Sequence, residues 1–232
     1  MLDPSRLPKH IAIIMDGNRR WARSHGLEII RGHEYVVDKV IEPLTDRCIE
    51  LGIPYLTLWA FSTENWKRDK AEIEGMMCLF RKAFERKTED LHAKGVRMQI
   101  LGDIEKFPGD IAEQAKKWAK LSEKNAKITI SFALNYGGRQ EILRGIHRAA
   151  QQGLDLSSIT EEQFSALLDT AKVPDPDLII RPGGQLRLSG FMPWQSVYSE
   201  LYFSDTLMPD FGAQELDLAL EEYQARQRRF GK

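Results

Sequence analysis

Two short basic segments of the sequence carry the residue types that bind phosphate groups. In the first, MDGNRRWAR, Asp16 ends an apolar run, and Gly17 and Asn18 allow a sharp turn into a helix. Backbone N–H groups at such a turn, together with Arg19 and Arg20, suit a phosphate. Asp16 lies amid this positive charge either as a helix N-cap or as a carboxylate that serves a metal or a reacting group. The second basic segment favours the functional interpretation.

That second segment, RPGGQLRLSG, places two arginines, two glycines and a serine within ten residues. It lacks the Gly-Lys-Ser/Thr ending of a Walker loop. Arg181 and Arg187 can each hold phosphate oxygens through two hydrogen bonds, the glycines permit close backbone approach, and Ser189 can add a hydroxyl. The alternative is a surface loop with solvated arginines. Together the two segments predict a site for two phosphorylated substrates.

Several single residues are weaker candidates, because each also has a structural interpretation. Glu200, between apolar neighbours, either pairs with an arginine or ligates a metal, and oxygen ligands beside phosphates suit Mg²⁺. Asn65 and Trp66 follow an apolar run and belong either to a lid over an apolar substrate or to the core. His33 is a proton carrier, a phosphate donor or a structural residue. Core packing is the more typical role of an apolar series at helical spacing: Ile73, Met77, Phe80 and Phe84.

Length and composition limit the class of protein. The 232 residues predict one domain, residues 1–232, with 42% hydrophobic and 29% charged residues. A net charge of -1 argues against a nucleic-acid binder that relies on bulk charge. Cys48 and Cys78 have no metal-site spacing, and no apolar run is long enough for a membrane span or a signal peptide. We therefore expect a cytoplasmic protein without an integral membrane segment or a nucleic-acid partner.

The elements that must position these residues alternate between short apolar runs and longer helical patterns. This alternation predicts an α/β fold with a central parallel β-sheet of about six strands flanked by helices. The polar, glycine-bearing segments follow the predicted strands, at the edge where open parallel sheets bind ligands. Strands are predicted at 10–15, 55–61, 96–102, 127–134, 177–181 and 196–203. Helices are predicted at 34–51, 71–95, 109–124, 139–152, 161–170 and 213–229.

The motifs, taken in order, carry a family resemblance over essentially the whole chain. The segments HIAIIMDGNRRWAR, FSTENWKR, NYGGR, DPDLIIRPGGQLRLSGFMPWQSVYSELYF and RQRRFG resemble those of the cis-prenyltransferases, the undecaprenyl diphosphate synthase family. The resemblance implies a prenyltransferase with an apolar tunnel over the sheet, Mg²⁺ as cofactor and a homodimer. The implied substrates are isoprenyl diphosphates, namely dimethylallyl diphosphate and isopentenyl diphosphate.

The resemblance also implies roles for individual residues. Asp16 matches the family's essential aspartate, which holds Mg²⁺ on the allylic diphosphate, and Glu200 matches a second metal-associated carboxylate. The basic end from Arg228 to Gly231 resembles a tail that reaches toward the partner subunit's site. The implied catalytic residues are Asp16, Asn18, His33 and Asn65. The implied substrate-binding residues are Gly17, Arg19, Arg20 and Trp21 in the first segment, Ser62, Trp66 and Arg68 in a mobile closing segment, and Arg181, Arg187 and Ser189 in the second diphosphate site.

The second diphosphate site departs from the family pattern. Where the family usually reads Arg-Thr-Gly-Gly-Glu or Arg-Thr-Ser-Gly-Glu, this chain has Pro182 and Gln185. Pro182 removes a backbone N–H and a hydroxyl, and Gln185 cannot carry a negative charge. Ionisation at the first site should survive, while the attacking substrate or its orientation differs. Tyr35, Val36 and Val37 also stand where small residues are usual, which predicts a shortened tunnel and a C10 to C15 product.

These departures favour an irregular reaction, the head-to-middle coupling of two dimethylallyl diphosphates to a C10 diphosphate of the lavandulyl or cyclolavandulyl type. The runner-up is regular cis elongation with isopentenyl diphosphate to a short product such as farnesyl diphosphate. A third alternative, a non-catalytic partner subunit, is disfavoured because Asp16, Asn18 and Arg20 are all present. The residues leave open the coupling mode and whether the product is linear, branched or cyclised.

Overall fold

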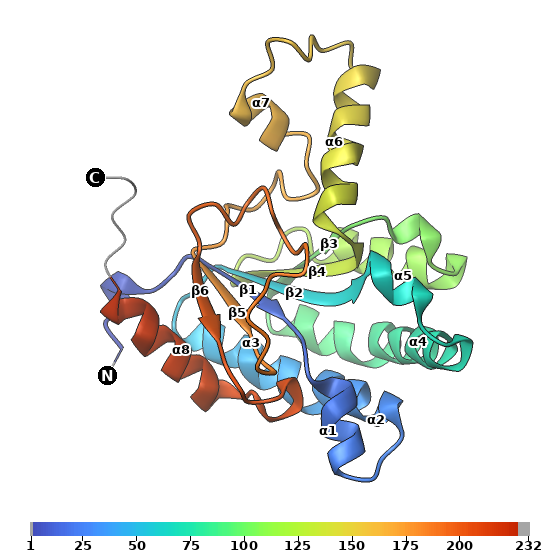
Figure 1. The fold of residues 1–232 in the computed structure, drawn as a ribbon, viewed down its shortest axis with the longest axis vertical. Helices are drawn as coiled ribbons and strands as arrows, with labels where there is room; N and C mark the ends of the chain where they lie inside the picture. The colour runs from blue at the N-terminus through green and yellow to red at the C-terminus, as the bar shows by residue number, and fades with distance from the viewer. Residues whose placement is uncertain (1, 227–232) are drawn as a thin grey trace.

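A six-stranded, wholly parallel β-sheet forms the centre of the structure (Figure 1), a computed structural model that describes residues 2–226. The strand order is β3-β4-β2-β1-β5-β6, so β1 and β2 lie in the middle. This confirms the predicted α/β class. In chain order, β1 to β6 are His10–Ile14, Tyr55–Ser62, Val96–Leu101, Ile128–Tyr136, Leu178–Arg181 and Glu200–Phe203.

Helices cover the sheet from two sides. Among the described residues they are α1 Asn18–Ser24, α2 Ile29–Tyr35, α3 Ile41–Glu50, α4 Lys70–Ala93, α5 Gly109–Leu121, α6 Gly138–Gln151, α7 Glu161–Ser165 and α8 Ala213–Ala225. In Figure 1, α3, α4 and α8 lie below the sheet together with α1 and α2, whereas α6 and α7 project above it as an arm.

Strand β1 is buried on both faces, which is typical of the middle of a parallel sheet. Ile13 points into a core shared with α3, where Leu44 is fully buried. Ala12, on the other face, packs in a second core with Phe191 from the loop between β5 and β6. A buried side chain of the size of Ile13, Leu44 or Phe191 contributes about 1.5–3 kcal/mol. The strand is thus held firmly, and so is the start of the basic segment that follows it.

The helix predicted after the first basic segment is divided by a wide turn. Residues Val36–Val40 form a π-helical turn between α2 and α3, in which the N–H of Ile41 donates to the carbonyl of Val36. Pro43, in the first turn of α3, has no N–H to offer the carbonyl of Lys39. Regular α-helical bonding therefore cannot continue through this point, and the wide turn joins the two helices.

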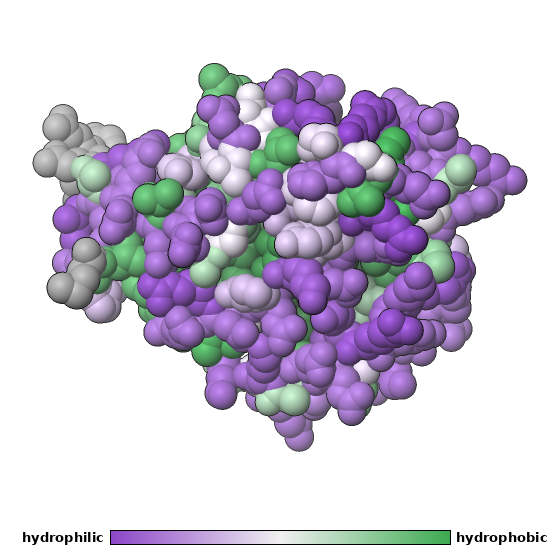
Figure 2. All heavy atoms as spheres, turned by 90° about the horizontal axis from the view of Figure 1, so that it is seen from below, coloured by the Kyte–Doolittle hydropathy of each residue, from purple (hydrophilic) through white to green (hydrophobic). Residues whose placement is uncertain are grey.

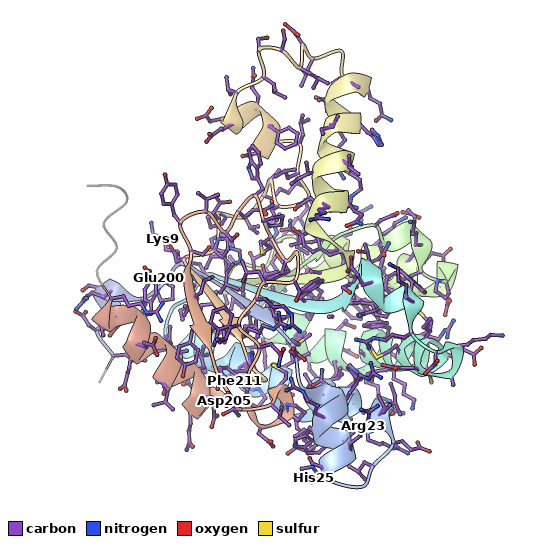
Figure 3. The ribbon with its side chains drawn as sticks, viewed as in Figure 1. Lys9, Arg23, His25, Glu200, Asp205 and Phe211 are labelled. Carbon is purple, nitrogen blue, oxygen red and sulfur yellow. The ribbon has the colours of Figure 1, made fainter. Side chains whose placement is uncertain are left out.

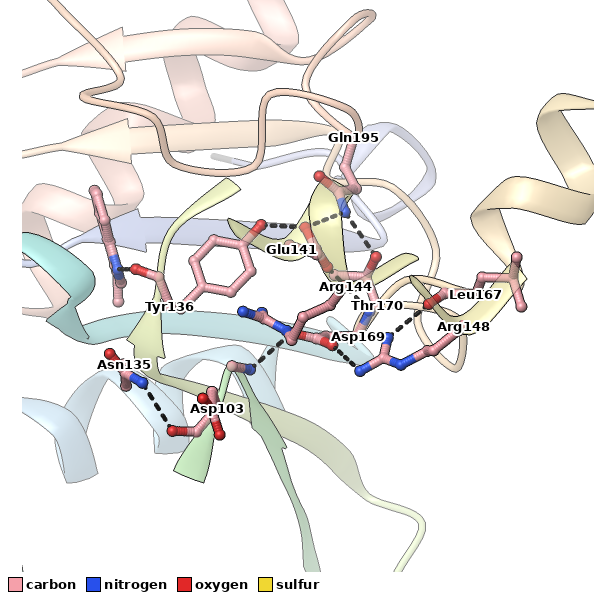
Figure 4. A network of polar contacts seen from close by, with 12 residues as sticks. Asp103, Asn135, Tyr136, Glu141, Arg144, Arg148, Leu167, Asp169, Thr170 and Gln195 are labelled. Carbon is pink, nitrogen blue, oxygen red and sulfur yellow. Dashed lines mark hydrogen bonds and ion pairs between the residues drawn. The ribbon is translucent and has the colours of Figure 1, made fainter. Parts of the chain in front are cut away.

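The arm above the sheet is fixed by a buried polar network (Figure 4). Glu141, at the start of α6, is fully buried and accepts hydrogen bonds from Tyr136 at 2.5 Å and from Gln195 at 3.0 Å. Burial raises the pKa of Glu141, although both hydrogen bonds oppose the shift. Asp169 pairs with Arg144 of the same helix. Because Gln195 belongs to the loop between β5 and β6, this network fixes that loop against α6.

The six strands match their predicted positions, except that the last begins at Glu200 instead of residue 196. The basic end from Arg228 to Gly231 lies outside the described residues. Within residues 2–226 no helix combines the length and apolar character that a bilayer span requires. The face in Figure 2, seen from below, is predominantly hydrophilic, with hydrophobic residues in small separate groups.

Candidate active site

The carboxyl ends of β1, β2 and β5 carry the first site residues at one edge of the sheet. Asp16 follows β1, Ser62 ends β2 and Arg181 ends β5. Arg181 Nη2 donates to Asp16 Oδ2 at 2.9 Å, although the two residues are 165 positions apart. The two basic segments therefore meet at one rim, as their places after parallel strands predict.

Asp16 is surrounded by hydrogen-bond donors. Its Oδ1 accepts from the N–H of Gly17 at 2.6 Å and lies 3.4 Å from Arg20 Nη2. The side chain is 30% exposed and lines the cavity at the rim. Gly17, not Asp16, occupies the N-cap position of α1. The helix-cap interpretation of Asp16 is therefore wrong, and its main partners are two arginines.

The glycines of the second segment serve contacts with neighbouring loops instead of a phosphate. Gly183 and Gly184 have φ values of 93° and 68°, and their N–H groups donate to the carbonyls of Thr206 and Ser204. A Cβ atom at Gly183 would lie 2.6 Å from Arg20 Nη2. Glycine at this position lets the two basic loops approach each other, and its N–H is already occupied.

Three buried side-chain atoms at the rim have no hydrogen-bond partner among the described residues, namely Asn18 Oδ1, His33 Nε2 and Arg181 Nε. Asn18 Nδ2 donates to the carbonyl of Met15 at 3.1 Å and contacts His33 Nδ1 at 3.3 Å. The bond to Met15 fixes the orientation of the amide, so His33 Nδ1 is an acceptor. An unpartnered buried polar atom is unfavourable unless a ligand satisfies it. Asn18, His33 and Arg181 all line the cavity, so these atoms mark a place for a ligand.

The environment of His33 determines its protonation state. Burial, with smaller contributions from the charges of Arg68 and Arg19, lowers the pKa of His33 to about 4. The ring is therefore neutral near pH 7, and its single proton resides on Nε2 because Nδ1 accepts. His33 is thus an unused hydrogen-bond donor at the rim. This favours the phosphate donor over the proton carrier among its sequence interpretations.

A polar cleft of about 300 Å³ adjoins the rim on the side of α1. It is lined by Arg19, Arg20, Arg23 and Arg68, and Asp16 is the only carboxylate among its described lining residues. Figure 3 shows Arg23 on α1, below the sheet. The motifs do not reveal Arg23 as a site residue. The available signal is its spacing of four residues from Arg19, which places both on one side of the helix.

Arg68 faces both the polar cleft and the apolar cavity. Its Nη1 donates to Glu72 at 2.8 Å, and Glu72 also lies 3.7 Å from Nε of Arg19. Burial lowers the pKa of Arg68, and the charge of Glu72 opposes this shift. Glu72, whose side chain is only 8% exposed, therefore positions two arginines from separate segments.

An apolar cavity of about 300 Å³ opens from the rim between the wide turn and α4. On α4 its lining side chains recur every three or four residues, from Met76 through Leu79 and Ala83 to Leu91. This stripe extends about 22 Å along the helix axis. The strands β2 and β4 supply the facing wall, including Phe132. The cavity is thus a long apolar channel with a charged mouth.

The expectation that the apolar series on α4 is plain core is correct for only half of the series. Phe80 and Phe84 line the cavity, whereas Ile73 and Met77 do not. All four belong to or pack against the same aromatic-rich core. Residues of the cavity wall and of the core therefore belong to the same stripe of α4. Helical spacing alone cannot tell which residues have which role.

Two residues expected at the site lie away from it. Trp21 is buried and donates from Nε1 to Asp210 at 2.9 Å, and its ring lies 4.7 Å from that of Tyr35, centroid to centroid. Neither Trp21 nor Tyr35 lines the cavity or the cleft, whereas Val36 and Val37 do line the cavity. Tyr35, which is 40% exposed, therefore cannot shorten the tunnel. Trp21 packs α1 against the segment before α8.

Some residues at and after the end of β2 lie at the site, and others belong to the core. Ser62 and Asn65 line the cavity, and the N–H of Ser62 donates to Asn65 Oδ1 at 3.0 Å. Trp66 donates from Nε1 to Asn135 at 2.9 Å, and its ring packs edge-on against Phe61 at 5.0 Å between centroids. Trp66 does not line the cavity. The core interpretation of Trp66 is therefore the one that the structure supports.

Glu200 lies at the opposite end of the sheet from Asp16. It pairs in register with Leu178, the first residue of β5, whereas the site is at the last. Figure 3 shows Glu200 and Asp205 at opposite ends of β6. Glu200 accepts a hydrogen bond from Arg226 Nη1 at 2.9 Å. Within this chain Glu200 and Asp16 therefore do not share a metal site, and arginine pairing is the interpretation that holds.

The second basic segment pairs most of its polar side chains internally, although Arg181 Nε is buried without a partner among the described residues. Arg181 is 4% exposed and donates from Nη1 to Ser189 Oγ at 2.8 Å and to the carbonyl of Arg187. Arg187 Nη1 donates to Gln185 Oε1 at 2.6 Å. Ser189 holds a φ of 53°, an unfavourable value for a residue with a side chain. The predicted residues are together at the rim, but paired with one another.

The donor set at the rim fits Mg²⁺ only in company with a diphosphate. Residues 2–226 contain no group of three or more His, Cys, Asp or Glu side chains that could hold a metal. Mg²⁺ is commonly bound by one or two carboxylates plus substrate phosphates and waters. Asp16, partly exposed at the mouth of cavity and cleft, is the residue that would hold it.

Phosphate-binding groups at the mouth of an apolar channel suit a substrate with a diphosphate head and a hydrocarbon tail. Residues 14–231 match the family model described as "Putative undecaprenyl diphosphate synthase". An isoprenyl transferase of Heliobacterium mobile is 46% identical over 234 residues, which cover 99% of this chain and 90% of that protein. The chain therefore belongs to the undecaprenyl diphosphate synthase family of cis-prenyltransferases, and it is a prenyltransferase.

Two solved structures are similar over nearly the whole chain. Lavandulyl diphosphate synthase from Lavandula x intermedia, in complex with dimethylallyl diphosphate, has a TM-score of 0.93 and 34% identity, covering 98% of this chain and 100% of that one. A probable undecaprenyl diphosphate synthase from Campylobacter jejuni has a TM-score of 0.82 and 33% identity, covering 97% and 99%. The fold is therefore that of the cis-prenyltransferases, as the motifs imply.

Proposed function

We propose that this prenyltransferase extends an allylic diphosphate with isopentenyl diphosphate in the cis configuration, with Mg²⁺ as cofactor. The observation that carries the proposal is the apolar cavity, whose stripe on α4 extends about 22 Å. A dimethylallyl group has four carbons in a line, as many as the stem of one lysine, and would leave most of this wall uncovered. A growing chain of several five-carbon units would cover it and gain the free energy of apolar burial.

In this proposal the allylic diphosphate binds at the first half-site, which comprises Asp16, Asn18, His33 and the arginines of the polar cleft. His33 Nε2–H and the guanidinium groups are donors in place before the reaction begins. Such preorganised donors stabilise the charge that develops on a leaving group. Asp16 would hold Mg²⁺, which when bound supplies further positive charge to the departing diphosphate.

The second half-site, comprising Arg181, Arg187 and Ser189, would hold isopentenyl diphosphate. When the carbon–oxygen bond of the allylic substrate breaks, its electron pair stays on the diphosphate and an allylic cation remains. The double bond of isopentenyl diphosphate attacks this cation, a carbon–carbon bond forms, and loss of a proton restores a double bond. The apolar walls exclude water, which would otherwise capture the cation.

A second candidate is the irregular head-to-middle coupling of two dimethylallyl diphosphates to a C10 diphosphate. Pro182 and Gln185 favour it, because both alter the half-site of the attacking substrate. The similarity to lavandulyl diphosphate synthase, at a TM-score of 0.93, is compatible with it. It ranks second because the channel is longer than two five-carbon chains require.

Three incubations with Mg²⁺ separate these candidates. They contain dimethylallyl diphosphate alone, dimethylallyl with isopentenyl diphosphate, and farnesyl with isopentenyl diphosphate. Regular elongation predicts that mass spectrometry finds products only when isopentenyl diphosphate is present, including products longer than C15 from the third mixture. A C10 diphosphate from dimethylallyl diphosphate alone, with no elongation in the third mixture, would reject the first candidate in favour of the second.

We also propose that two copies form a homodimer through the arm of α6 and α7. Four apolar side chains on and after α6 are between 37% and 54% exposed: Leu143, Ile146, Leu154 and Leu156. A cluster of exposed apolar residues on a projecting element is typical of a protein interface. Light scattering should give twice the chain mass of 26.6 kDa, and Leu143→Glu should reduce it to one chain. A wild-type mass of one chain would refute the dimer.

A further inference from the structure

A lysine lies at the distal end of the apolar cavity, where the proposed chemistry uses no charged group. The distal end is formed by Lys87, Thr88 and Leu91, the last cavity-lining residues along α4. Lys87 lies about 16 Å along the helix axis from Met76 near the mouth. We infer that Lys87 is a specificity-determining residue that limits the length of the prenyl chain. This inference rests on the proposed elongation reaction.

Lys87 is the only charged side chain away from the mouth among the described residues that line the cavity. An ammonium group inside an apolar cavity is strongly unfavourable. A lysine in such a wall therefore lays its hydrocarbon stem along the apolar surface and directs its charge to water. The side chain is 29% exposed, and its Nζ lies 4.0 Å from Glu42 Oε2 on α3. The stem of Lys87 thus lies between the channel and solvent.

The acidic partner is fixed, whereas the lysine is held loosely. Glu42 pairs at 2.7 Å with Nζ of Lys94, and this hydrogen bond is the main reason that the pKa of Glu42 is lowered. Lys94 also binds Asp46 at 2.7 Å. Compared with these contacts, the 4.0 Å separation of Lys87 and Glu42 is a weak, solvent-screened attraction. Lys87 can therefore be replaced without dismantling the ion pairs between α3 and α4.

The other residues of the distal end are parts of the core. Thr88 and Leu91 are 5% and 6% exposed, and Leu91 packs in the main hydrophobic cluster. Truncating them would create a cavity in the core and reduce stability. Lys87 is the position at the distal end where truncation opens the channel toward solvent and leaves the core packing in place.

The test compares the product lengths of wild type and variants with farnesyl diphosphate, isopentenyl diphosphate and Mg²⁺. Lys87→Ala removes the stem, and Lys87→Met keeps a stem of similar length without the charge. Arg86→Ala is the matched control, because it removes an exposed cation one residue away that does not line the cavity. Lys87→Trp fills the distal end. Circular dichroism verifies that each variant is folded.

We expect Lys87→Ala to shift the longest product by at least one five-carbon unit upward and Lys87→Trp to shift it downward. Lys87→Met and Arg86→Ala should match the wild type. Identical product lengths for Lys87→Ala, Lys87→Trp and wild type would overturn the inference, and so would equal lengthening by Lys87→Met. Absence of elongation products from every protein, the wild type included, would instead reject the proposed function on which the inference rests.

Discussion

The two half-sites at the rim contain the same kinds of side chain but differ in how those side chains are used. In the first half-site, Asn18 Oδ1 and His33 Nε2 have no partner among the described residues, and arginines line an open cleft. In the second, Arg181 donates to Asp16 and Ser189, and Arg187 donates to Gln185. The first half-site therefore offers an idle donor, His33 Nε2–H, beside an open cleft. In the second half-site a substrate must displace internal hydrogen bonds to reach any donor other than Arg181 Nε.

This difference has a thermodynamic consequence. A diphosphate that enters the first half-site can accept from the idle N–H of His33, so less of its interaction energy is spent on rearrangement. A diphosphate that enters the second displaces contacts that the loop already makes, and only the surplus appears as affinity. The attacking substrate should therefore bind more weakly than the allylic one, and variants of the two half-sites should behave differently.

The largest effect is expected at Asp16, because this residue contacts both half-sites. Asp16→Ala removes the proposed Mg²⁺ ligand and leaves the buried guanidinium of Arg181 without its carboxylate partner. We expect kcat to fall about 10²–10³-fold, in line with the loss of one preorganised charge-stabilising group. Product formation at saturating Mg²⁺ measures the loss, and circular dichroism tests that the fold is intact. Wild-type turnover by folded Asp16→Ala would show that Asp16 does not link the half-sites.

The next largest effect, about tenfold, is expected on pyrophosphate binding when an arginine of the first half-site is replaced, and a smaller one when an arginine of the second is replaced. Arg20→Gln removes from the open cleft a guanidinium held only by the long 3.4 Å contact to Asp16, and should weaken the binding of inorganic pyrophosphate with Mg²⁺ about tenfold. Arg187→Gln should weaken it less than about twofold, because the side chain of Arg187 is already engaged by Gln185. Calorimetric titration of both variants measures the two losses. Equal losses would contradict the contrast between a preformed and a self-paired half-site.

The sequence predicted where the two half-sites lie but not how their side chains are paired. Polar residues after parallel strands located the rim, because the carboxyl ends of such strands meet. The register of β5 and β6 is not visible in the sequence, so Glu200 was assigned to the metal although it lies at the far end of the sheet. Hydrogen-bond pairing within a loop is equally invisible. Motifs therefore located Arg181 and Arg187 without indicating that both are occupied.

The channel was harder to predict than the rim. A residue's place on a helix follows from α-helical spacing, but the π-helical turn at Val36–Val40 changes that spacing. Tyr35, the last residue of α2, faces outward although it precedes two lining valines, because successive residues of a helix point in different directions. Pro43 was the available signal for the irregularity. Lys87 carried no signal at all, since a lysine on an amphipathic helix ordinarily faces water.

A few-fold effect is expected from restoring the family residues of the second half-site. Pro182→Thr combined with Gln185→Glu returns a hydroxyl, a backbone donor and a negative charge beside Arg187. A charge-assisted hydrogen bond to Arg187 is stronger than the present one and should hold the guanidinium in place. KM for isopentenyl diphosphate should fall a few-fold while KM for the allylic substrate stays the same. A change confined to KM for the allylic substrate would mean that positions 182 and 185 act on the first half-site instead of the second.

The smallest effect is expected in stability near neutral pH, and of the two half-sites only the first should contribute to it. The folded pKa of His33 is about 4, below the unfolded value near 6.5, so the unfolded chain takes up the proton first as pH falls. This contribution to stability is present above pH 6.5 and is lost as pH falls toward 4. Between pH 7 and pH 6 it amounts to less than about 1 kcal/mol.

Urea unfolding at pH 7 and pH 6 measures this loss. His10, whose pKa burial also lowers to about 4, contributes a similar share, so His33→Gln should remove only part of the pH dependence. Arg187→Gln, in the self-paired half-site, should leave the pH dependence as it is in the wild type. If His33→Gln also left it unchanged, the imidazole would not be held neutral by its surroundings, and His33 could not be the idle donor that distinguishes the first half-site.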